Sequence, residues 1–354
     1  MGASVAYWLT RMQPGLAVAL VERDRSFARA SSALSASSIR QQFSTPVNVR
    51  MSLFGAQFLR ENDIAFNESG YLYLGEGFEG AHAVQKANGA DVALLSAAET
   101  KRRFPWLNVD DVKQGSLGLS GEGWFDGQGL HAFFLGSARK QGARMIYDEA
   151  RSLRQGEIAL QHATLRCRHV VNAAGPWAGP LAAHAGIDLP VRARRRTVFV
   201  VSCPARLERC PLVIDPSGFW FRPDGAVFIA GDEPALDEDD LPLEPQLAEF
   251  DEALWGRMAH RVPAFEALRV ERAWAGYYDM NVFDGNAIIG SHPSRPGVWF
   301  INGFSGHGLQ HAAAAGRGLA ELILDGGFSS LDLSPLSFQR ILEGKPLVEA
   351  NIIG

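Results

Sequence analysis

The chain has 354 residues, of which 47% are hydrophobic and 21% charged, a composition typical of a soluble globular protein. Its formal net charge of −5 argues against nucleic-acid binding, which requires a basic surface. Cys167, Cys203 and Cys210 form no C-x-x-C pair or metal-ligand spacing, so we predict neither disulfide nor metal site. No apolar run reaches the roughly 18–20 residues of a transmembrane segment. No basic leader precedes the first helix, so we expect a cytoplasmic protein.

The N-terminal residues have the pattern of the second half of a β-α-β unit. Apolar residues at helical spacing predict a helix over residues 3–12, which Pro14 and Gly15 end. Residues 16–21 form a short apolar run, typical of a parallel strand buried on both faces. The strand that normally precedes such a helix is absent from the sequence as given. We therefore expect it upstream of Met1.

Helices and strands then alternate along the chain. Helices are predicted over residues 47–61, 79–88, 96–103 and 128–141, and strands over residues 70–75 and 143–147. Two or three short strands follow within residues 157–173. Residues 191–278 are strand-rich with one helix near 246–258, and a buried strand at 298–301 leads into a helix over 309–325.

This arrangement predicts two domains woven from one chain, because β-α units occupy both ends and strands dominate the middle. We expect one domain from residues 1–69, 128–190 and 285–354, and the other from residues 70–127 and 191–284. Two charged runs are interpreted as surface features. The arginines of residues 192–196 are assigned to the solvent side of a strand start, and the acidic residues 237–240 to a solvated loop.

Gly2 and Glu22 have the spacing of a dinucleotide fingerprint. Gly2 opens the first helix, and Glu22 ends the following strand twenty positions later. In the fingerprint, the third glycine and the acidic residue that binds a ribose hydroxyl are separated in this way. A glycine at a helix start and a glutamate after a strand are also common, so the pair alone fits an ordinary turn equally well.

Three further motifs lie at strand ends or in loops. Residues 172–178 follow an apolar strand with small residues, which either admit a flat cofactor or make an ordinary strand-to-helix turn. Residues 303–310 contain three glycines before a helix, where free N–H groups favour electron-rich oxygen. His307 in this turn either donates to a bound cofactor or caps the helix. Arg40 lies among small residues after a flexible loop, and its alternative is a surface arginine.

In order and spacing these motifs resemble the FAD-dependent oxidoreductases of the D-amino-acid oxidase and sarcosine oxidase superfamily. The chain is most similar to their FAD-dependent oxidoreductase domain branch, near the sarcosine and dimethylglycine dehydrogenases. The resemblance covers residues 2–326 and implies an α/β fold. In that fold, a glutathione-reductase-like FAD-binding domain is interleaved with a mixed-sheet substrate domain. The matching motifs are residues 38–44, 172–177, 274–279 with 284–290, and 303–310.

The resemblance also implies roles for individual residues. The substrate and catalytic side is assigned to Arg40, Tyr277, Tyr278, His307 and Gln310. FAD contacts are assigned to Gly2, Glu22, Arg23, Ser38, Ala174, Gly175, Trp177, Gly303, Ser305, Gly306, His307, Gly308 and Leu309.

Departures from the family pattern carry predictions of their own. Residues 28–42 contain no His and residues 270–285 no Cys, so the covalent flavin links of some relatives are absent and FAD is expected to be non-covalent. Ile229 takes the place of a lysine that promotes reaction with oxygen in monomeric sarcosine oxidases. We therefore expect a dehydrogenase with an electron acceptor other than oxygen. Gln310 replaces a substrate-binding lysine, which argues against small N-methyl amino acids.

The sequence therefore predicts FAD-dependent oxidation of a C–N bond in a secondary amine or amino acid, by hydride transfer to flavin N5. The imine produced would then be hydrolysed by water. One alternative is oxidation of a C–O bond, as in 2-hydroxy-acid relatives, with Arg222 or Arg272 binding an anionic substrate. A second is a flavin-binding scaffold or assembly factor without turnover, and a third is a non-functional truncated chain. The expected partners are a small-molecule substrate and an acceptor, with no nucleic acid.

Overall fold

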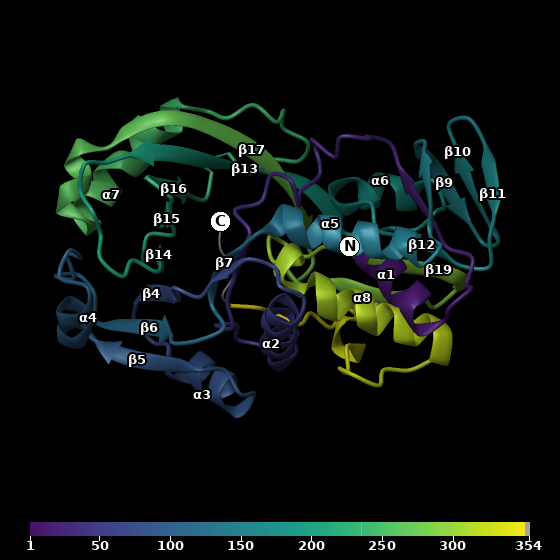
Figure 1. Ribbon diagram of the computed structural model, residues 1–354, viewed down its shortest axis with the longest axis horizontal. Coiled ribbons are helices and arrows are strands. Elements are labelled where there is room, and N and C mark those ends of the chain that lie inside the picture. The colour runs from purple at the N-terminus through teal and green to yellow at the C-terminus, as the bar shows by residue number, and fades with distance from the viewer. Residues whose placement is uncertain (235, 351–354) are drawn as a thin grey trace.

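The computed structural model describes residues 1–234 and 236–350, which form two lobes joined by two long strands (Figure 1). These strands, β13 (Val191–Ser202) and β17 (Arg269–Asn281), pair antiparallel along most of their length. Val191 at the start of β13 packs in the apolar cluster of one lobe, with Val298. Val201 near its end packs in the core of the other lobe, with Phe199. The two lobes are thus connected by continuous sheet.

The first lobe is built from parallel strand pairs and helices. Strand β1 pairs parallel with β8, and β12 pairs parallel with β19, which pairs antiparallel with β18. A three-stranded antiparallel meander, β9 to β11, lies at its edge in Figure 1. The bounds are α1 (Gly2–Met12), β1 (Ala19–Glu22), α5 (Gly127–Lys140), β8 (Arg144–Tyr147), β9 (Ala150–Arg154), β10 (Glu157–Leu160), β11 (Thr164–Arg166), β12 (Val170–Asn172), α6 (Ala178–Ala183), β18 (Ile288–His292), β19 (Arg295–Asn302), α8 (Gly308–Asp325) and α9 (Gln339–Leu342).

Close packing of α1 on α8 places the starts of both helices side by side. The Ser4 hydroxyl donates to the Ala312 carbonyl at 2.7 Å, and the Trp8 indole N–H donates to Ala313 at 3.0 Å. Gly316 permits this approach, because a Cβ there would lie 2.1 Å from Ser4 Oγ. The Met1 side chain consequently reaches the first residue of α8, Gly308.

The second lobe is an eight-stranded sheet in the order β17-β13-β16-β15-β14-β4-β6-β5. On one face, Phe199 and Phe221 pack beneath α7 and against Phe265 of the turn Pro263–Ala267 that follows it. The other face carries a separate apolar cluster that includes Val198 and Trp220. The bounds are β4 (Tyr71–Gly75), β5 (Val92–Ser96), β6 (Gln114–Gly118), β14 (Leu212–Ile214), β15 (Trp220–Asp224), β16 (Val227–Gly231), α7 (Trp255–Arg261), α3 (Glu79–Ala87) and α4 (Ala97–Arg103).

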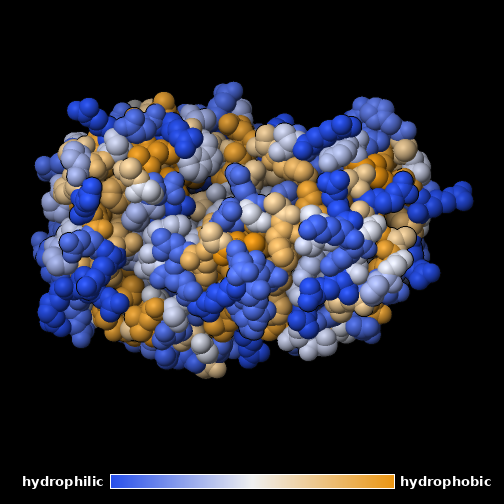
Figure 2. Space-filling model, viewed as in Figure 1, coloured by the Kyte–Doolittle hydropathy of each residue, from blue (hydrophilic) through white to orange (hydrophobic). Residues whose placement is uncertain are grey.

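Between the lobes lies helix α2 (Pro46–Glu61), which packs on α8 (Figure 1). A short sheet of β2 (Ser38–Ile39), β7 (Gly123–Phe125) and β3 (Phe66–Asn67) joins the loop before α2 to the rest. Among the helices of the described ranges, none combines the length and hydropathy that crossing a bilayer requires. On the face drawn in Figure 2, apolar side chains occur in small areas separated by polar ones.

Most predicted elements are present, and four expectations need correction. The first strand begins at Ala19, because the Leu16 N–H bonds to Gln13 in a turn, and it is only half-buried. The helix near 246–258 forms later, as a π-helical turn Phe250–Leu254 followed by α7. Arg195 and Arg196 are buried rather than solvent-facing. The acidic loop is held across β13, where Asp237 pairs with Arg196 at 2.7 Å.

Candidate functional site

A cavity of about 1440 Å³ is lined by residues of both lobes. It extends from β1 and the meander, past the starts of α1 and α8, to the apolar cluster of the large sheet. This volume exceeds the roughly 300–1,000 Å³ of common small-molecule pockets. Part of the volume lies among apolar residues between β1 and β12, such as Val18 and Val171, and the rest extends from the helix starts to the large sheet.

The starts of α1 and α8 both line this cavity, at Gly2 and Gly308. The first N–H groups of a helix have no partner within the helix, and the helix dipole adds positive potential there. Two such helix ends at one cavity favour a negatively charged group between them. Their arrangement suits the pyrophosphate of a dinucleotide.

The cavity end beside β1 carries an aromatic and a cationic side chain in contact. The Arg23 guanidinium lies 4.0 Å above the Trp177 ring, and Tyr277 meets that ring edge-on with centroids 6.0 Å apart. Glu22 lies at the same end, where one carboxylate oxygen accepts the Asp24 N–H at 2.9 Å. The predicted residues Glu22, Arg23 and Trp177 are thus brought together. Ser38, Ala174, Gly175 and Leu309 also line the cavity.

The glycine-rich turn before α8 divides into two parts. Gly306, His307 and Gly308 line the cavity, whereas Gly303 and Ser305 lie outside its lining. The Gly303 N–H donates to Asp279 at 2.8 Å, and the Ser305 hydroxyl oxygen accepts the Asn281 N–H at 3.0 Å. These two residues therefore anchor the turn to β17, and the turn presents the residues that follow.

Asp279 also lines the cavity. It belongs to the motif of residues 274–279, but it was not predicted as a site residue. Burial raises its pKa to about 6, and the N–H groups of Phe304 and Gly303 oppose this rise. Its spacing after the two tyrosines of β17 was the signal available in the sequence. Because its carboxylate holds the backbone of the turn, we assign it to the shape of the site.

His307 is the N-cap residue of α8, but its ring makes no capping hydrogen bond to the described residues. Burial and the nearby Arg40 charge lower its pKa to about 3, and a hydrogen bond to the Gly285 backbone only partly offsets this. The ring is therefore neutral at pH 7. Its buried Nε2 has no hydrogen-bond partner within residues 1–234 and 236–350. An unpaired buried ring nitrogen in a cavity wall fits a ligand that completes its hydrogen bond.

Two arginines and a tyrosine converge beyond this turn. The Arg196 guanidinium lies 5.2 Å from the Tyr278 ring centroid. Burial raises the pKa of the Tyr278 hydroxyl, and the charges of Arg196 and Arg40 both oppose the rise. All three side chains line the cavity. This pole of the cavity therefore has the charge and the donors that bind a carboxylate.

Arg196 was not predicted as a site residue, because the whole basic run of residues 192–196 was assigned to the surface. A signal was present: Arg196 precedes the apolar Val198 by two residues, so both side chains share one face of β13. Conversely, Tyr277 and Tyr278 lie on opposite faces of β17. The Tyr277 hydroxyl donates to the Leu241 carbonyl at 2.5 Å, away from Tyr278.

The loop that contains Arg40, Ser44 and Thr45 is held from two sides. The Gln310 side-chain oxygen accepts the Arg40 N–H at 2.9 Å, which ties the start of α8 to this loop. The Glu349 carboxylate accepts hydrogen bonds from Ser44 at 2.6 Å and from Thr45 at 2.9 Å, at the start of α2. Burial alone would raise the pKa of Glu349, but the Ser44 hydrogen bonds and the Arg40 charge keep it below its ordinary value.

The two cations considered for binding an anionic hydroxy acid, Arg222 and Arg272, lie outside the cavity lining.

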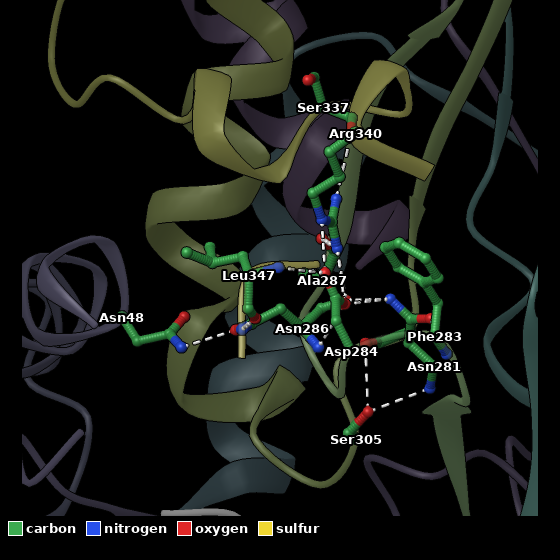
Figure 3. Close-up of polar contacts among 11 residues, drawn as sticks. Asn48, Asn281, Phe283, Asp284, Asn286, Ala287, Ser305, Ser337, Arg340 and Leu347 are labelled. Atoms are coloured by element: carbon green, nitrogen blue, oxygen red, sulfur yellow. Dashed lines mark hydrogen bonds and ion pairs between the residues drawn. The ribbon is translucent and has the colours of Figure 1, made fainter. Parts of the chain in front are cut away.

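Residues 284–290, the second part of the motif that begins at Trp274, have a structural role (Figure 3). The Asp284 carboxylate pairs with Arg340 at 2.7 Å and accepts the Leu347 N–H at 3.0 Å. Asn281 donates to Asp284 at 2.8 Å, and Asn286 accepts from Asn48 at 2.7 Å. The motif thus fixes the C-terminal segment to the β17–β18 connection and to α2.

Among the described residues, His, Cys, Asp and Glu side chains do not gather in groups that would hold a metal ion.

Glu122 is buried behind the Arg40 loop, where it accepts the Gln41 N–H at 2.6 Å and the Gln42 side-chain N–H at 2.8 Å. Burial raises its pKa to about 7 from 4.5. The folded chain therefore binds this proton more tightly than the unfolded chain. Its contribution to stability is full below pH 4.5 and is lost as the pH rises through 7.

We expect Glu122→Gln to remove this pH dependence. Between pH 4.5 and 7.5 the free energy of unfolding of the wild type should fall by about 3 kcal/mol relative to Glu122→Gln. Urea denaturation at several pH values measures the difference, with Glu61→Gln at the exposed end of α2 as control. Parallel pH profiles for wild type and Glu122→Gln would contradict the assignment.

Comparison with known proteins agrees with this geometry. The chain matches the family described as FAD dependent oxidoreductase (DAO) over residues 1–322. It is 42% identical to the FAD-dependent oxidoreductase domain-containing protein 1 of Xenopus laevis, covering 100% of this chain and 83% of that protein. It is 26% identical to the mitochondrial sarcosine dehydrogenase of Homo sapiens, over 68% of this chain and 28% of that protein.

Solved structures share the fold. The L-proline dehydrogenase of P. horikoshii superposes with a TM-score of 0.87 at 24% identity, over 97% of this chain and 96% of that one. The glycine oxidase of Geobacillus kaustophilus gives a TM-score of 0.80 at 24% identity, over 96% and 95% of the two chains. The predicted fold class is therefore confirmed.

Proposed function

We infer that this chain, which belongs to the FAD-dependent oxidoreductase family, oxidises a C–N bond of a secondary amine or amino acid. FAD is the cofactor, and when bound it accepts the two electrons and the hydrogen that leave the substrate carbon. We propose that the start of α1 with Glu22, Arg23 and Trp177 holds its ADP half, and that Gly306 and His307 border its ring. The expected division into an FAD-binding and a substrate domain remains our proposal.

One observation carries the choice of a C–N bond: the cavity end beside α8 has cationic groups that suit a carboxylate, its histidine is a weak base, and its Asp279 carboxylate already accepts backbone N–H groups. Arg40, Arg196 and Tyr278 supply charge and donors for a substrate carboxylate. His307, with a pKa near 3, is too weakly basic to take a hydroxyl proton at pH 7. An amine can lose its proton to water before it binds, whereas a hydroxyl of a hydroxy acid cannot.

The protein's contribution is to orient the substrate and to exclude water. The arginines fix the carboxylate, and the Tyr278 ring, packed on Gly306, bounds the space beside the turn. As the substrate carbon loses its hydrogen with the electron pair, the nitrogen lone pair forms the C=N bond of an imine. Water then hydrolyses the imine to a carbonyl compound and an amine or ammonia.

The relatives support this substrate class, because sarcosine dehydrogenase and glycine oxidase act, by name, on amino acids. The test is anaerobic mixing of the FAD-loaded protein with panels of amino acids, N-methyl amino acids and 2-hydroxy acids. We expect loss of the oxidised flavin absorbance with members of the first two panels. Reduction by 2-hydroxy acids alone, or by none of the three panels, would overturn the proposal.

We further propose a dehydrogenase that uses an acceptor other than oxygen. Ile229 lies on the cavity-side face of the large sheet, buried beside Val200, where an oxidase would place a lysine charge. The reduced protein should react with oxygen on the order of a hundredfold more slowly than with a quinone or dye. Stopped-flow reoxidation in air-saturated buffer measures this, and reoxidation by oxygen at the rate seen with the dye would contradict it.

A further inference from the structure

We propose that the substrate is an amino acid, or an N-substituted amino acid, whose side chain is large and apolar. This inference rests on the proposed function and specifies its substrate class. It is carried by an apolar wall, defined as Tyr71, Val198, Leu212, Ile214 and Trp220. All five side chains are buried in one cluster and line the cavity.

The wall is a continuous part of the large sheet. Leu212 of β14 stands opposite Tyr71 of β4 in a parallel pair, and Ile214 stands opposite Trp220 of β15 in an antiparallel pair. Val198 extends the same apolar face on β13. Neighbouring strands lie about 4.8 Å apart, so the wall, which extends from β13 to β4 across four strand spacings, is roughly 19 Å wide and has ample room for a branched or aromatic side chain.

The position of the Trp220 ring is fixed by the strand beneath it. Trp220 stands opposite Gly231 of β16, and a Cβ at Gly231 would lie 2.7 Å from the indole ring. The ring therefore lies flat against the backbone of β16.

A second close contact brings the cavity-lining Leu34 onto β17 at Gly276, where a Cβ would lie 2.9 Å from Leu34. The Trp274 indole N–H holds this loop by donating to the Leu34 carbonyl at 2.9 Å.

The distance from the wall to the cationic end of the cavity, at Arg40 and Arg196, suits one amino acid. Arg196 and Val198 are two residues apart on β13 and share a face, which places them about 7 Å apart along the strand. A carboxylate bound at Arg196 and Arg40 would thus leave the substrate side chain directed along the sheet toward Val198 and Trp220. A substrate without a side chain, such as a glycine derivative, would leave this wall uncovered.

The experiment measures binding and turnover separately on the FAD-loaded protein. Acetate and phenylacetate, which cannot be oxidised at a C–N bond, are titrated while the flavin absorbance spectrum and the melting temperature are recorded. We expect phenylacetate to bind at least about tenfold more tightly than acetate. We also expect N-methylphenylalanine to exceed sarcosine in kcat/KM by about a hundredfold, since each apolar group buried in a fitted pocket gives about tenfold or more.

Two variants test the wall, and one controls for tryptophan loss. Trp220→Ala and the smaller change Leu212→Ala should each weaken phenylacetate binding about tenfold and leave acetate binding unchanged. Trp255→Ala, at an exposed tryptophan of α7, should alter neither affinity. The Leu212 variant keeps the test available if Trp220→Ala fails to fold.

The outcomes separate this inference from the proposed function. Equal affinities for acetate and phenylacetate, together with flavin reduction by sarcosine, would overturn the inference and leave the function standing. Tight phenylacetate binding without flavin reduction by any amine or amino acid would overturn the function but support an apolar acid as ligand.

Discussion

Replacing Arg340 with alanine is expected to lower the free energy of unfolding by about 3 to 5 kcal/mol. Arg340 donates to the Asp284 carboxylate at 2.7 and 3.0 Å and to the carbonyls of Asn286 and Ala287 at 3.0 and 2.9 Å. The Asp284 side chain is fully buried, so the variant leaves a carboxylate without its cation in a region that water does not reach. Urea denaturation of the FAD-loaded chain measures the loss.

Two further variants show whether the loss comes from the buried charge. Lys345→Ala breaks the exposed pair with Glu343 and should change stability by less than about 1 kcal/mol. The double variant Asp284→Asn with Arg340→Met should be more stable than Arg340→Met alone, because it leaves no unpaired charge. If Arg340→Ala and Lys345→Ala cost the same, the buried pair has no special role in holding the C-terminal segment.

Local sequence patterns predicted the elements that frame the cavity. The helix over residues 3–12 is observed as α1, because its apolar spacing matches its contacts with α5 and α8. The helix over residues 309–325 is observed as α8, one residue longer at its start. Both begin at a glycine, and their N-termini meet at the cavity. Periodicity and glycine placement are local properties, so a single sequence is sufficient to find them.

Contacts between residues far apart in the sequence could not be predicted from local patterns. The motif at Asp284 was recognised, but its partner Arg340 lies 56 residues later, outside any motif. Glu349 reaches the start of α2 from the last residues that the structure describes. No periodicity links such positions, since the pairing depends on how the C-terminal segment folds back.

Charge alone also misled the interpretation of residues 192–196. Arginine is usually exposed, so a run of arginines indicates a surface. Here Arg196 is buried because Asp237 pairs with it and Tyr278 packs beneath it. The strand alternation that places it beside Val198 was in the sequence, and it was the better guide. A buried arginine in the wall of a cavity is thus found by strand face rather than by charge density.

Arg40→Met is expected to raise KM for an amino-acid substrate about tenfold to hundredfold. The change removes a charge-assisted hydrogen bond to the substrate carboxylate, worth about 1.5 to 3 kcal/mol, and retains an apolar side chain for packing on Phe43. FAD should remain bound, because the ADP half of its proposed site lies at the other end of the cavity. Steady-state turnover with an artificial acceptor gives KM and kcat, and flavin absorbance gives the bound FAD per chain.

Comparison with Glu349→Gln and Arg50→Met identifies the cause of the change. Glu349→Gln keeps the Arg40 charge but loosens the loop that Ser44 and Thr45 anchor, so it should raise KM less than Arg40→Met does. Arg50→Met, on the exposed face of α2, should leave KM unchanged. An unchanged KM in Arg40→Met, with FAD fully bound, would mean that Arg40 does not bind the carboxylate. Because Arg196 reaches the same pole from β13, a rise in KM for Arg196→Met alone would then assign that role to Arg196.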